Sequence, residues 1–124
     1  MTPLNRTVLV VEDEFLIAQG LQMQVEEMGV PVCGTASTAA AAIAMAEAHR
    51  PAVVLMDVRL DGARDGVDAA LAIHEAVGAK IIFITGSREE STQARIAMDH
   101  PSAILFKPIS NLQLRRAVND ALAG

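Results

Sequence analysis

Five short apolar runs alternate with longer segments in which apolar residues recur every three or four positions. The runs cover residues 7–11, 32–36, 52–56, 81–84 and 103–106. They are apolar throughout rather than at every second position, which is typical of strands that are covered on both faces. The pattern therefore predicts five β-strands, each followed by a helix, in a doubly wound α/β fold with a five-stranded parallel sheet.

Capping residues mark the ends of the first three predicted helices. The first helix has one apolar face, formed by Ile17, Leu21, Val25 and Met28. Gly29 follows that helix and Gly78 follows the third, predicted over 67–77, as C-terminal caps. Either Ser37 or Thr38 begins an alanine-rich second helix that ends before Pro51.

The last two helices carry the pattern of a capping box, in which a Ser and a Glu or Gln three residues later satisfy each other's backbone groups. Ser87 with Glu90 predicts the start of the fourth helix, and Ser110 with Gln113 predicts the start of the fifth. Because the fifth helix extends to the end of the 124 residues, we expect a single domain over 1–124 with no output domain.

Composition and charge narrow the function classes. The formal charge of -5 and the absence of Trp and Tyr disfavour a nucleic-acid binder, which needs basic patches and stacking aromatics. No apolar run approaches the length needed to cross a membrane. Cys33 is the single cysteine, so a reducing compartment is expected and the protein is interpreted as cytoplasmic.

Polar residues gather where the predicted strands end. They are Glu12 and Asp13 after the first strand, Asp57 after the third, Thr85 and Gly86 after the fourth, and Lys107 and Pro108 after the fifth. Taken singly, most of them have an ordinary explanation as a loop or surface residue, but Asp57 is harder to explain in this way because a partly buried carboxylate needs a compensating charge or hydrogen bonds. In a doubly wound sheet, however, ligands bind beyond the carboxyl ends of the strands. We therefore expect these side chains to form one site.

The residue types indicate the chemistry of that site. Converging carboxylates of Glu12, Asp13 and Asp57 repel one another unless a cation joins them. Mg²⁺ prefers oxygen ligands and recruits phosphate oxygens. Lys107 and the Thr85 hydroxyl then complete a cradle for a phosphoryl group, and Asp57 is the candidate nucleophile because a carboxylate can form an aspartyl phosphate.

With these residues in place, the whole chain resembles a response-regulator receiver domain of two-component signalling. The matching motifs are V-L-V-V-E-D-E at 8–14, V-L-M-D at 54–57, D-G at 65–66, I-T-G at 84–86 and F-K-P at 106–108. The resemblance implies a flavodoxin-like fold with strand order 2-1-3-4-5. It also implies phosphoryl transfer from a sensor histidine kinase, or a phosphotransfer protein, to Asp57 with Mg²⁺, by which the domain regulates partner proteins or acts as a phosphate shuttle or sink.

The resemblance assigns roles residue by residue. Asp13, Asp57 and the backbone carbonyl of Arg59 would bind Mg²⁺ directly, and Glu12 would reach it through water. Lys107 would pair with the carboxylate or phosphoryl oxygen. Thr85, followed by Gly86, would rotate towards the phosphoryl group and bias the fourth helix. The peptide bond between Lys107 and Pro108 is predicted to be cis.

Some positions depart from the family pattern. Ile104 stands where many receivers have a Tyr or Phe that moves with the Thr, so we expect no aromatic gate of the usual form, and core packing for Phe106 and Phe83. The loop after Asp57 carries Asp61 where a Pro is common. Together with F-I-T-G at 83–86, it resembles single-domain receivers of alphaproteobacterial stress pathways, which pair with kinases of the HWE class.

Other functions remain as alternatives. One is a Mg²⁺-dependent aspartyl-phosphate hydrolase, which Arg59 disfavours because such enzymes usually have a second acid there. Another is a pseudo-receiver that only binds partners, or a receiver cut from a longer protein. Charged residues of the last two helices would form a solvated face or, as in some receivers, a dimer face; they are Arg95, Asp99, Arg115, Arg116 and Asp120.

Overall fold

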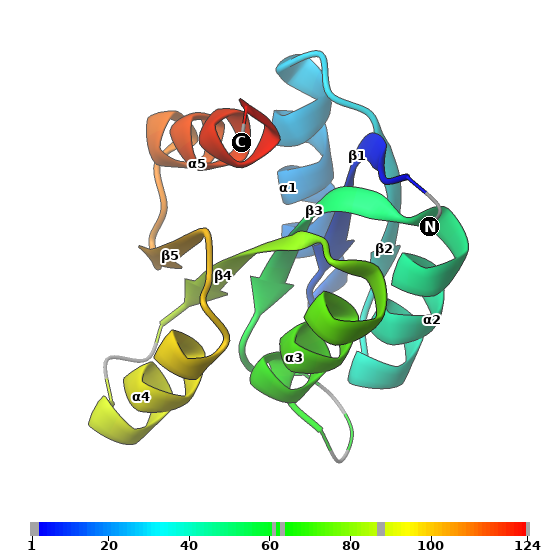
Figure 1. Cartoon of the computed structure of the whole chain (residues 1–124). Helices are drawn as coiled ribbons and strands as arrows, with labels where there is room; N and C mark the ends of the chain where they lie inside the picture. The colour runs from blue at the N-terminus through cyan, green and yellow to red at the C-terminus, as the bar shows by residue number, and fades with distance from the viewer. Residues whose placement is uncertain (1–2, 61, 63, 87–88, 124) are drawn as a thin grey trace.

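The computed structural model describes residues 3–60, 62, 64–86 and 89–123, in which strands and helices alternate along the chain (Figure 1). The strands are β1 (Asn5–Val11), β2 (Val32–Ala36), β3 (Pro51–Asp57), β4 (Lys80–Thr85) and β5 (Ala103–Phe106). The helices are α1 (Phe15–Glu27), α2 (Ala39–His49), α3 (Gly66–Val77), α4 (Glu90–Met98) and α5 (Asn111–Ala123). This alternation confirms the predicted β-α repeats.

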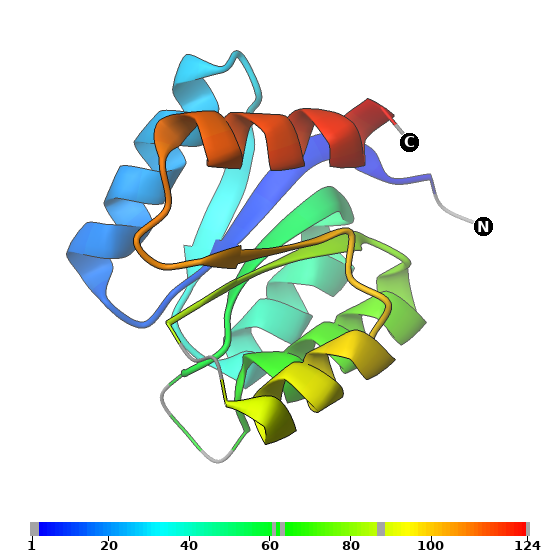
Figure 2. The same ribbon diagram turned by 90° about the vertical axis from the view of Figure 1, so that its left-hand side faces the viewer.

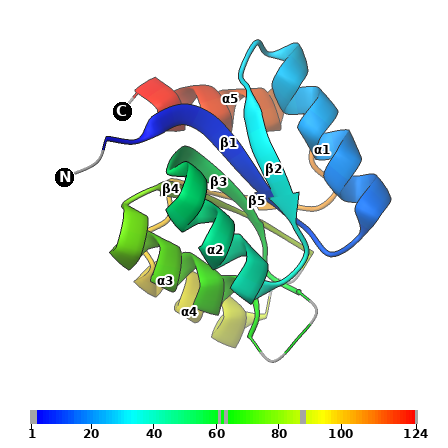
Figure 3. The same cartoon turned by 90° about the vertical axis from the view of Figure 1, so that its right-hand side faces the viewer.

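The strands form one parallel sheet in the order β2-β1-β3-β4-β5, as the resemblance implied. Helices α1 and α5 cover one face, while α2, α3 and α4 cover the other (Figures 2 and 3). The chain thus has the flavodoxin-like arrangement. From β1 the chain passes to the edge strand β2 on one side and then to the central β3 on the other, which creates a crevice beyond the carboxyl ends of β1 and β3.

Both faces of the sheet are buried, which explains the continuous apolar runs. Val8 and Val10 of β1 pack under α1 and α5, whereas Leu9 and Val11 of the same strand pack under α2 and α3. Successive side chains of a strand point to opposite faces, so a strand between two helical layers needs apolar residues at every position. β3 begins one residue earlier than predicted, at Pro51, because proline is tolerated at the first position of a strand.

Several predicted caps are confirmed. Thr38, rather than Ser37, is the N-cap of α2, and its side chain accepts a hydrogen bond from the backbone of the following turn. Gly29 and Gly78 follow α1 and α3 with φ of 82° and 81°. At the start of α5, the Ser110 backbone N–H donates to the Gln113 side chain at 2.8 Å, and the Gln113 N–H donates to Ser110 Oγ at 3.1 Å.

The beginnings of α3 and α4 differ from the prediction. Asp65 is the N-cap of α3 and forms a capping box with Asp68, which the sequence reading missed because the fourth position is Asp rather than Glu or Gln. Helix α4 begins at Glu90 after Glu89, and no side chain of Glu89 caps it. The Ser87 cap lies outside the described residues. No helix in the described part of the chain is long and apolar enough to span a membrane.

Candidate metal and phosphoryl site at the strand ends

Parallel strand ends bring the predicted site residues together. Glu12 and Asp13 follow β1, Asp57 is the last residue of the neighbouring β3, Thr85 is the last residue of β4, and Lys107 follows β5. Asp57 and Thr85 therefore belong to the strands themselves rather than to the loops after them. The rigid sheet, instead of a flexible loop, holds the central carboxylate and hydroxyl.

Three carboxylates converge at this edge of the sheet. Oxygens of Glu12, Asp13 and Asp57 all lie within 4.8 Å of one another. Glu12 and Asp57 are buried, with only 3% and 7% of their surface exposed, whereas Asp13 is half-buried. Carboxylates this close and this dry require a cation or protons, because burial and mutual repulsion both disfavour the ionised forms.

Lys107 supplies a positive charge to this group. Its Nζ lies 3.5 Å from Asp57 Oδ1 and 3.6 Å from Glu12 Oε1. One ammonium cannot neutralise three carboxylates. Although Lys107 is within ion-pair range, Glu12 Oε1 is buried and has no hydrogen-bond partner among the described residues.

Glu12 shows the electrostatic consequence. The pKa of Glu12 is raised from 4.5 to about 7, chiefly by burial and also by the neighbouring Asp13 and Asp57 carboxylates, against the lowering effect of a hydrogen bond from the Glu14 backbone N–H. That N–H donates to Glu12 Oε2 at 3.0 Å, which fixes the side chain. One oxygen of Glu12 is thus held while the other faces the acidic group without a donor.

A cleft of about 540 Å³ opens above the carboxylates. Its lining consists of Asp13, Glu14, Asp57, Arg59, Thr85, Gly86, Glu89 and Lys107. Most of the predicted site residues therefore face one cleft, with Glu12 buried beside it. Glu14 and Glu89 were not predicted; Glu14 belongs to the acidic run that drew attention to this strand end, but no motif singled out Glu89.

The residues that were predicted to lie around the site, rather than in it, are found in the core, in β5 and at the cis peptide bond. Ile104 and Phe106 lie half-buried in β5, and Ile104 packs against the core under α2 and α3; neither lines the cleft. Phe83 is fully buried, which confirms its core role. The bond between Lys107 and Pro108 is cis, as predicted. Asp61, the departure in the loop after β3, lies outside the described residues.

The donor set fits a hard divalent cation. All three side chains offer carboxylate oxygens, the ligands that Mg²⁺ takes in proteins, and the buried Glu12 Oε1 has no hydrogen-bond donor among the described residues. Asp13 and Asp57 line the cleft, so waters and phosphate oxygens can complete the coordination sphere there. The described residues therefore accommodate a Mg²⁺ ion with one open side.

Gly66 allows α3 to begin directly beside this site. Its backbone N–H donates to the Val58 carbonyl at 2.7 Å, which ties the first turn of α3 to the strand end. A Cβ at this position would overlap the carbonyl oxygen of Asp57 and lie 2.8 Å from the carbonyl carbon. Only glycine permits this approach. The D-G motif at 65–66 thus has a steric reason here.

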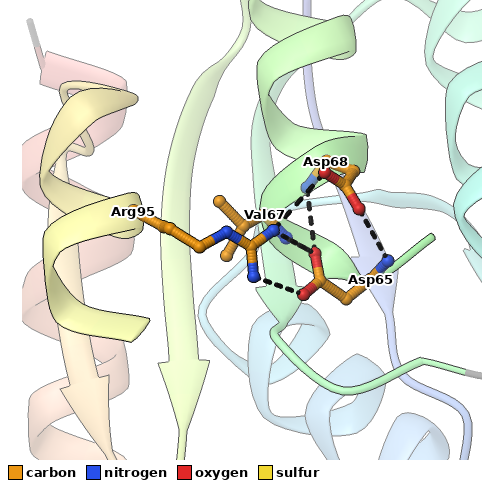
Figure 4. A network of polar contacts seen from close by, with 4 residues as sticks. All are labelled: Asp65, Val67, Asp68 and Arg95. Atoms are coloured by element: carbon orange, nitrogen blue, oxygen red, sulfur yellow. Dashed lines mark hydrogen bonds and ion pairs between the residues drawn. The ribbon is translucent and has the colours of Figure 1, made fainter. Parts of the chain in front are cut away.

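The interpretation of a solvated face of α4 was wrong for Asp99, while Arg95 is exposed, as predicted, but is paired with another helix. Arg95 crosses to α3, where Nη1 lies 2.8 Å from Asp65 Oδ2 and Nη2 lies 3.1 Å from Asp65 Oδ1 (Figure 4). Asp99 is buried, with 5% of its surface exposed. The error arose because helical periodicity locates a polar face but does not show which neighbouring helix covers it.

Known proteins resemble this chain over nearly its whole length. A family model described as the response regulator receiver domain matches residues 8–119. The transcriptional regulatory protein PdtaR of Mycobacterium tuberculosis is 35% identical over 95% of this chain and 57% of its own length. The phyllosphere-induced regulator PhyR of Methylorubrum extorquens, an alphaproteobacterium, is 31% identical over 93% of this chain and 43% of its own length. The chain spans about half the length of these curated relatives.

Solved structures of receiver domains have the same fold as this chain. The signal receiver domain of a modulated diguanylate cyclase from Desulfovibrio desulfuricans G20 superposes with a TM-score of 0.89 at 35% identity, covering 94% of this chain and 93% of that chain. The receiver domain of the response regulator NarL from Mycobacterium tuberculosis gives 0.88 at 27% identity, covering 98% and 99%. Family model, relatives and acidic pocket coincide: the chain belongs to the response regulator receiver family of two-component phosphorelay signalling, whose members work with histidine kinases.

Proposed function

We propose that this chain accepts a phosphoryl group on Asp57 with the help of Mg²⁺ and passes the signal to partner proteins through a change in conformation. The single observation that carries the proposal is the convergence of Glu12, Asp13 and Asp57 beside Lys107 in an open cleft. A structural role alone gives no reason to gather three carboxylates around one lysine, because their repulsion lowers stability.

The transfer step follows from this geometry. A carboxylate oxygen of Asp57 attacks the phosphorus of a phosphohistidine; the new O–P bond forms as the N–P bond breaks, and the imidazole leaves as the neutral base after taking a proton from solvent. Bound Mg²⁺, held by Asp13, Asp57 and the Arg59 carbonyl, would neutralise charge on the transferring group. Lys107, 3.5 Å from Asp57 Oδ1, stabilises the negative charge that gathers on the phosphoryl oxygens.

Reversal of the signal uses the same cleft. Water attacks the phosphorus of the acyl phosphate, the bond between Asp57 and phosphorus breaks, and inorganic phosphate leaves as the Asp57 carboxylate is regenerated. The chain itself thus catalyses both phosphorylation and dephosphorylation. Thr85 is buried at the end of β4 and lines the cleft beside Gly86. Its hydroxyl donates to a phosphoryl oxygen, and the segment between β4 and α4 carries that change to α4.

Intact mass and amide NMR test the proposal directly. Wild-type protein with Mg²⁺ and acetyl phosphate should gain one phosphoryl group, and Mg²⁺ with beryllofluoride should shift the amides of Thr85 and α4. Asp57→Asn should show neither effect. As a matched control, Asp120→Asn removes the same charge from the exposed face of α5 and should behave as wild type. Absence of both effects in the wild type would leave a pseudo-receiver that only binds partners.

The hydrolase alternative predicts a different time course. An aspartyl-phosphate hydrolase would turn over p-nitrophenyl phosphate repeatedly, whereas a receiver is labelled once and then loses the label slowly. Arg59, exposed at the rim of the cleft, occupies the position where such enzymes carry a general acid. We expect no more than one phosphoryl group per chain and no continuous release of p-nitrophenol.

The phosphodonor must approach through the surface around this cleft. An apolar groove of about 510 Å³ adjoins it, shares Glu12 and Lys107 with the site, and includes Ile17, Met23 and Ile109. Phe15 and Leu16, at the start of α1, are 70% and 79% exposed. Burial of such side chains drives protein association. We propose that the histidine kinase, of the HWE class, covers α1 and this groove while its phosphohistidine enters the cleft.

Two phosphodonors separate docking from chemistry. Ile17→Glu should slow transfer from a phosphorylated kinase that labels the wild type, because a charge replaces apolar contact, but should leave labelling by acetyl phosphate unchanged. Leu71→Glu, an equivalent change at a 45% exposed leucine on α3, should leave both reactions unchanged. Equal transfer to wild type and Ile17→Glu would exclude this face as the docking surface.

A further inference from the structure

Helix α4 buries fewer residues against the rest of the protein than the other helices do. Ile96 is its single buried residue within the helix, whereas each of the other helices buries at least three. Most of its remaining side chains are exposed. Because burial of apolar side chains supplies most of the free energy that holds a helix to its sheet, the position of α4 depends on its polar contacts more than that of its neighbours does.

Arg95 makes the principal polar contact between α4 and α3 that the structure describes. Its guanidinium is bound in a forked arrangement to both carboxylate oxygens of Asp65, and Nη2 also lies 3.4 Å from Asp68 Oδ1 (Figure 4). Asp65 in turn accepts hydrogen bonds from the first backbone N–H groups of α3. Arg95 therefore ties α4 to the residue that begins α3, directly after the loop that carries Arg59.

Asp99 is the C-cap of α4 and lies four residues after Arg95, the spacing at which residues on one side of a helix face each other. It is 5% exposed, yet its Oδ2 has no hydrogen-bond partner among the described residues. A carboxylate is also unfavourable at the C-terminal end of a helix, where the macrodipole is negative. Arg95 is engaged by Asp65 and donates no hydrogen bond to the Asp99 Oδ2 atom.

We propose that Arg95 is a two-position latch: it holds α4 in the resting state through Asp65 and, when α4 shifts, transfers to Asp99. In the resting state the Asp65 pair is made and the Asp99 oxygen is orphaned. In the shifted state Arg95 follows its own helix, and the pairing with Asp99 relieves the orphan. Because Arg95 gives up one carboxylate partner and gains another, the two positions of α4 have comparable free energy. This inference rests on the proposed function only in its second state.

The role of the Arg95–Asp65 pair in the resting state can be tested without any phosphoryl group. Amide hydrogen exchange of α4 should become about two- to fivefold faster in Arg95→Gln, the range expected for a partly exposed ion pair. Asp65→Asn should have a similar effect, because Asn remains a good N-cap while the charge is lost. The double variant should be no faster than either single one. Arg116→Gln, on the exposed face of α5, serves as the control with the same change of charge.

The transfer of Arg95 to Asp99 predicts that two variants, each of which removes one negative charge, change the affinity for beryllofluoride in opposite directions. Affinity for beryllofluoride with Mg²⁺ should rise about two- to fivefold in Asp65→Asn, since only the resting state is weakened. It should fall by a similar factor in Asp99→Asn, since the resting state loses its orphaned carboxylate and the shifted state loses its partner. Reduced repulsion of an anionic ligand would instead move both affinities upwards.

The outcomes distinguish this inference from the proposed function. If wild type binds no beryllofluoride, the proposed function fails, while the exchange experiment still reports on the resting pair. If exchange in α4 is unchanged in Arg95→Gln, or the Arg95 and Asp65 effects simply add, the latch does not exist. If Asp65→Asn and Asp99→Asn shift affinity in the same direction, Arg95 does not transfer between them.

Discussion

At the scale of single residues, the site depends on one close approach that only glycine permits. Gly66 begins α3 where a side chain would meet the backbone of Asp57, the proposed phosphoacceptor. Gly20, in the middle of α1, has no atom within 4 Å of a Cβ placed on it. The two glycines therefore have opposite consequences although both lie in helices.

Gly66→Ala should lower the free energy of unfolding by about 1–3 kcal/mol, as expected when an added methyl group forces backbone to move. It should also reduce labelling of Asp57 by acetyl phosphate, because the strand end shifts. Gly20→Ala should instead raise the free energy of unfolding by about 0.5–1 kcal/mol, the helix preference of Ala over Gly. Urea unfolding of the two variants measures both; equal effects would contradict the steric argument.

Glu12 gives the stability of the metal-free protein a specific pH dependence. Burial and, to a smaller extent, the neighbouring carboxylates raise its pKa to about 7 in the folded chain, whereas its ordinary pKa of 4.5 applies to the unfolded chain. Between these values the folded state binds more protons than the unfolded state, so stability falls as pH rises. Above about pH 7, Glu12 is ionised in both states, and the loss of stability from its buried charge has reached its full size.

Without divalent cations, the free energy of unfolding of wild type should therefore decline between about pH 4.5 and 7 relative to Glu12→Gln, whose amide imitates the protonated acid. Glu12→Gln should be the more stable protein at pH 8. Chemical denaturation across this range in EDTA provides the measurement. Parallel pH profiles for the two proteins would show that Glu12 titrates normally in the folded state.

At the scale of elements, the start of α2 shows which of two adjacent hydroxyl residues, Ser37 or Thr38, is the N-cap. Thr38 accepts a hydrogen bond from the Ala41 backbone N–H at 3.1 Å, while the adjacent Ser37 is exposed. Both residue types are good N-caps. Backbone conformation settles the choice: Thr38 has the extended φ and ψ that a residue before the first helical turn requires.

Thr38→Ala should lower the free energy of unfolding by about 1 kcal/mol, the usual effect of losing an N-cap. Ser37→Ala, next to it, should change the free energy of unfolding by less than about 0.5 kcal/mol, as for most surface positions. Thermal and urea unfolding of the pair provide the comparison. A larger loss in Ser37→Ala would mean that α2 begins one residue earlier in solution.

At the scale of the whole molecule, the fold brings together charges that repel one another. Given a net charge of -5 and three converging carboxylates, the Mg²⁺ binding that we propose would be thermodynamically linked to folding. The carboxylates lie at the carboxyl ends of β1 and β3, so a bound ion would join parts of the chain that are far apart in sequence. Mg²⁺ should therefore stabilise the entire domain rather than one loop.

The melting temperature should rise with Mg²⁺ concentration, reaching a stabilisation of about 2.7 kcal/mol when Mg²⁺ is at 100 times its dissociation constant. Asp13→Asn should reduce this increment strongly, and Asp57→Asn should do the same. Because both changes also relieve repulsion, both variants should be more stable than wild type in EDTA. NaCl at matched ionic strength controls for screening; an equal rise with NaCl would exclude a specific site.

Much of this architecture follows from the sequence. Apolar runs such as 52–56 predict strands buried on both faces, Gly78 and Ser110 mark helix ends, and the motifs around Asp57 identify the family. These features are local, since periodicity and capping depend on residues within a few positions. The strands and helices that they predict agree with the structure to within one to three residues.

Contacts between distant segments required the tertiary structure. The sequence placed Arg95 and Asp99 on a solvated face, but packing of α4 against α3 pairs the first with Asp65 and buries the second. The raised pKa of Glu12 and the overlap that excludes a side chain at Gly66 likewise depend on distances across the sheet edge. Local patterns determined the elements and the kind of site. Only folding decided which charges meet, because burial and through-space distance are properties of the packed chain.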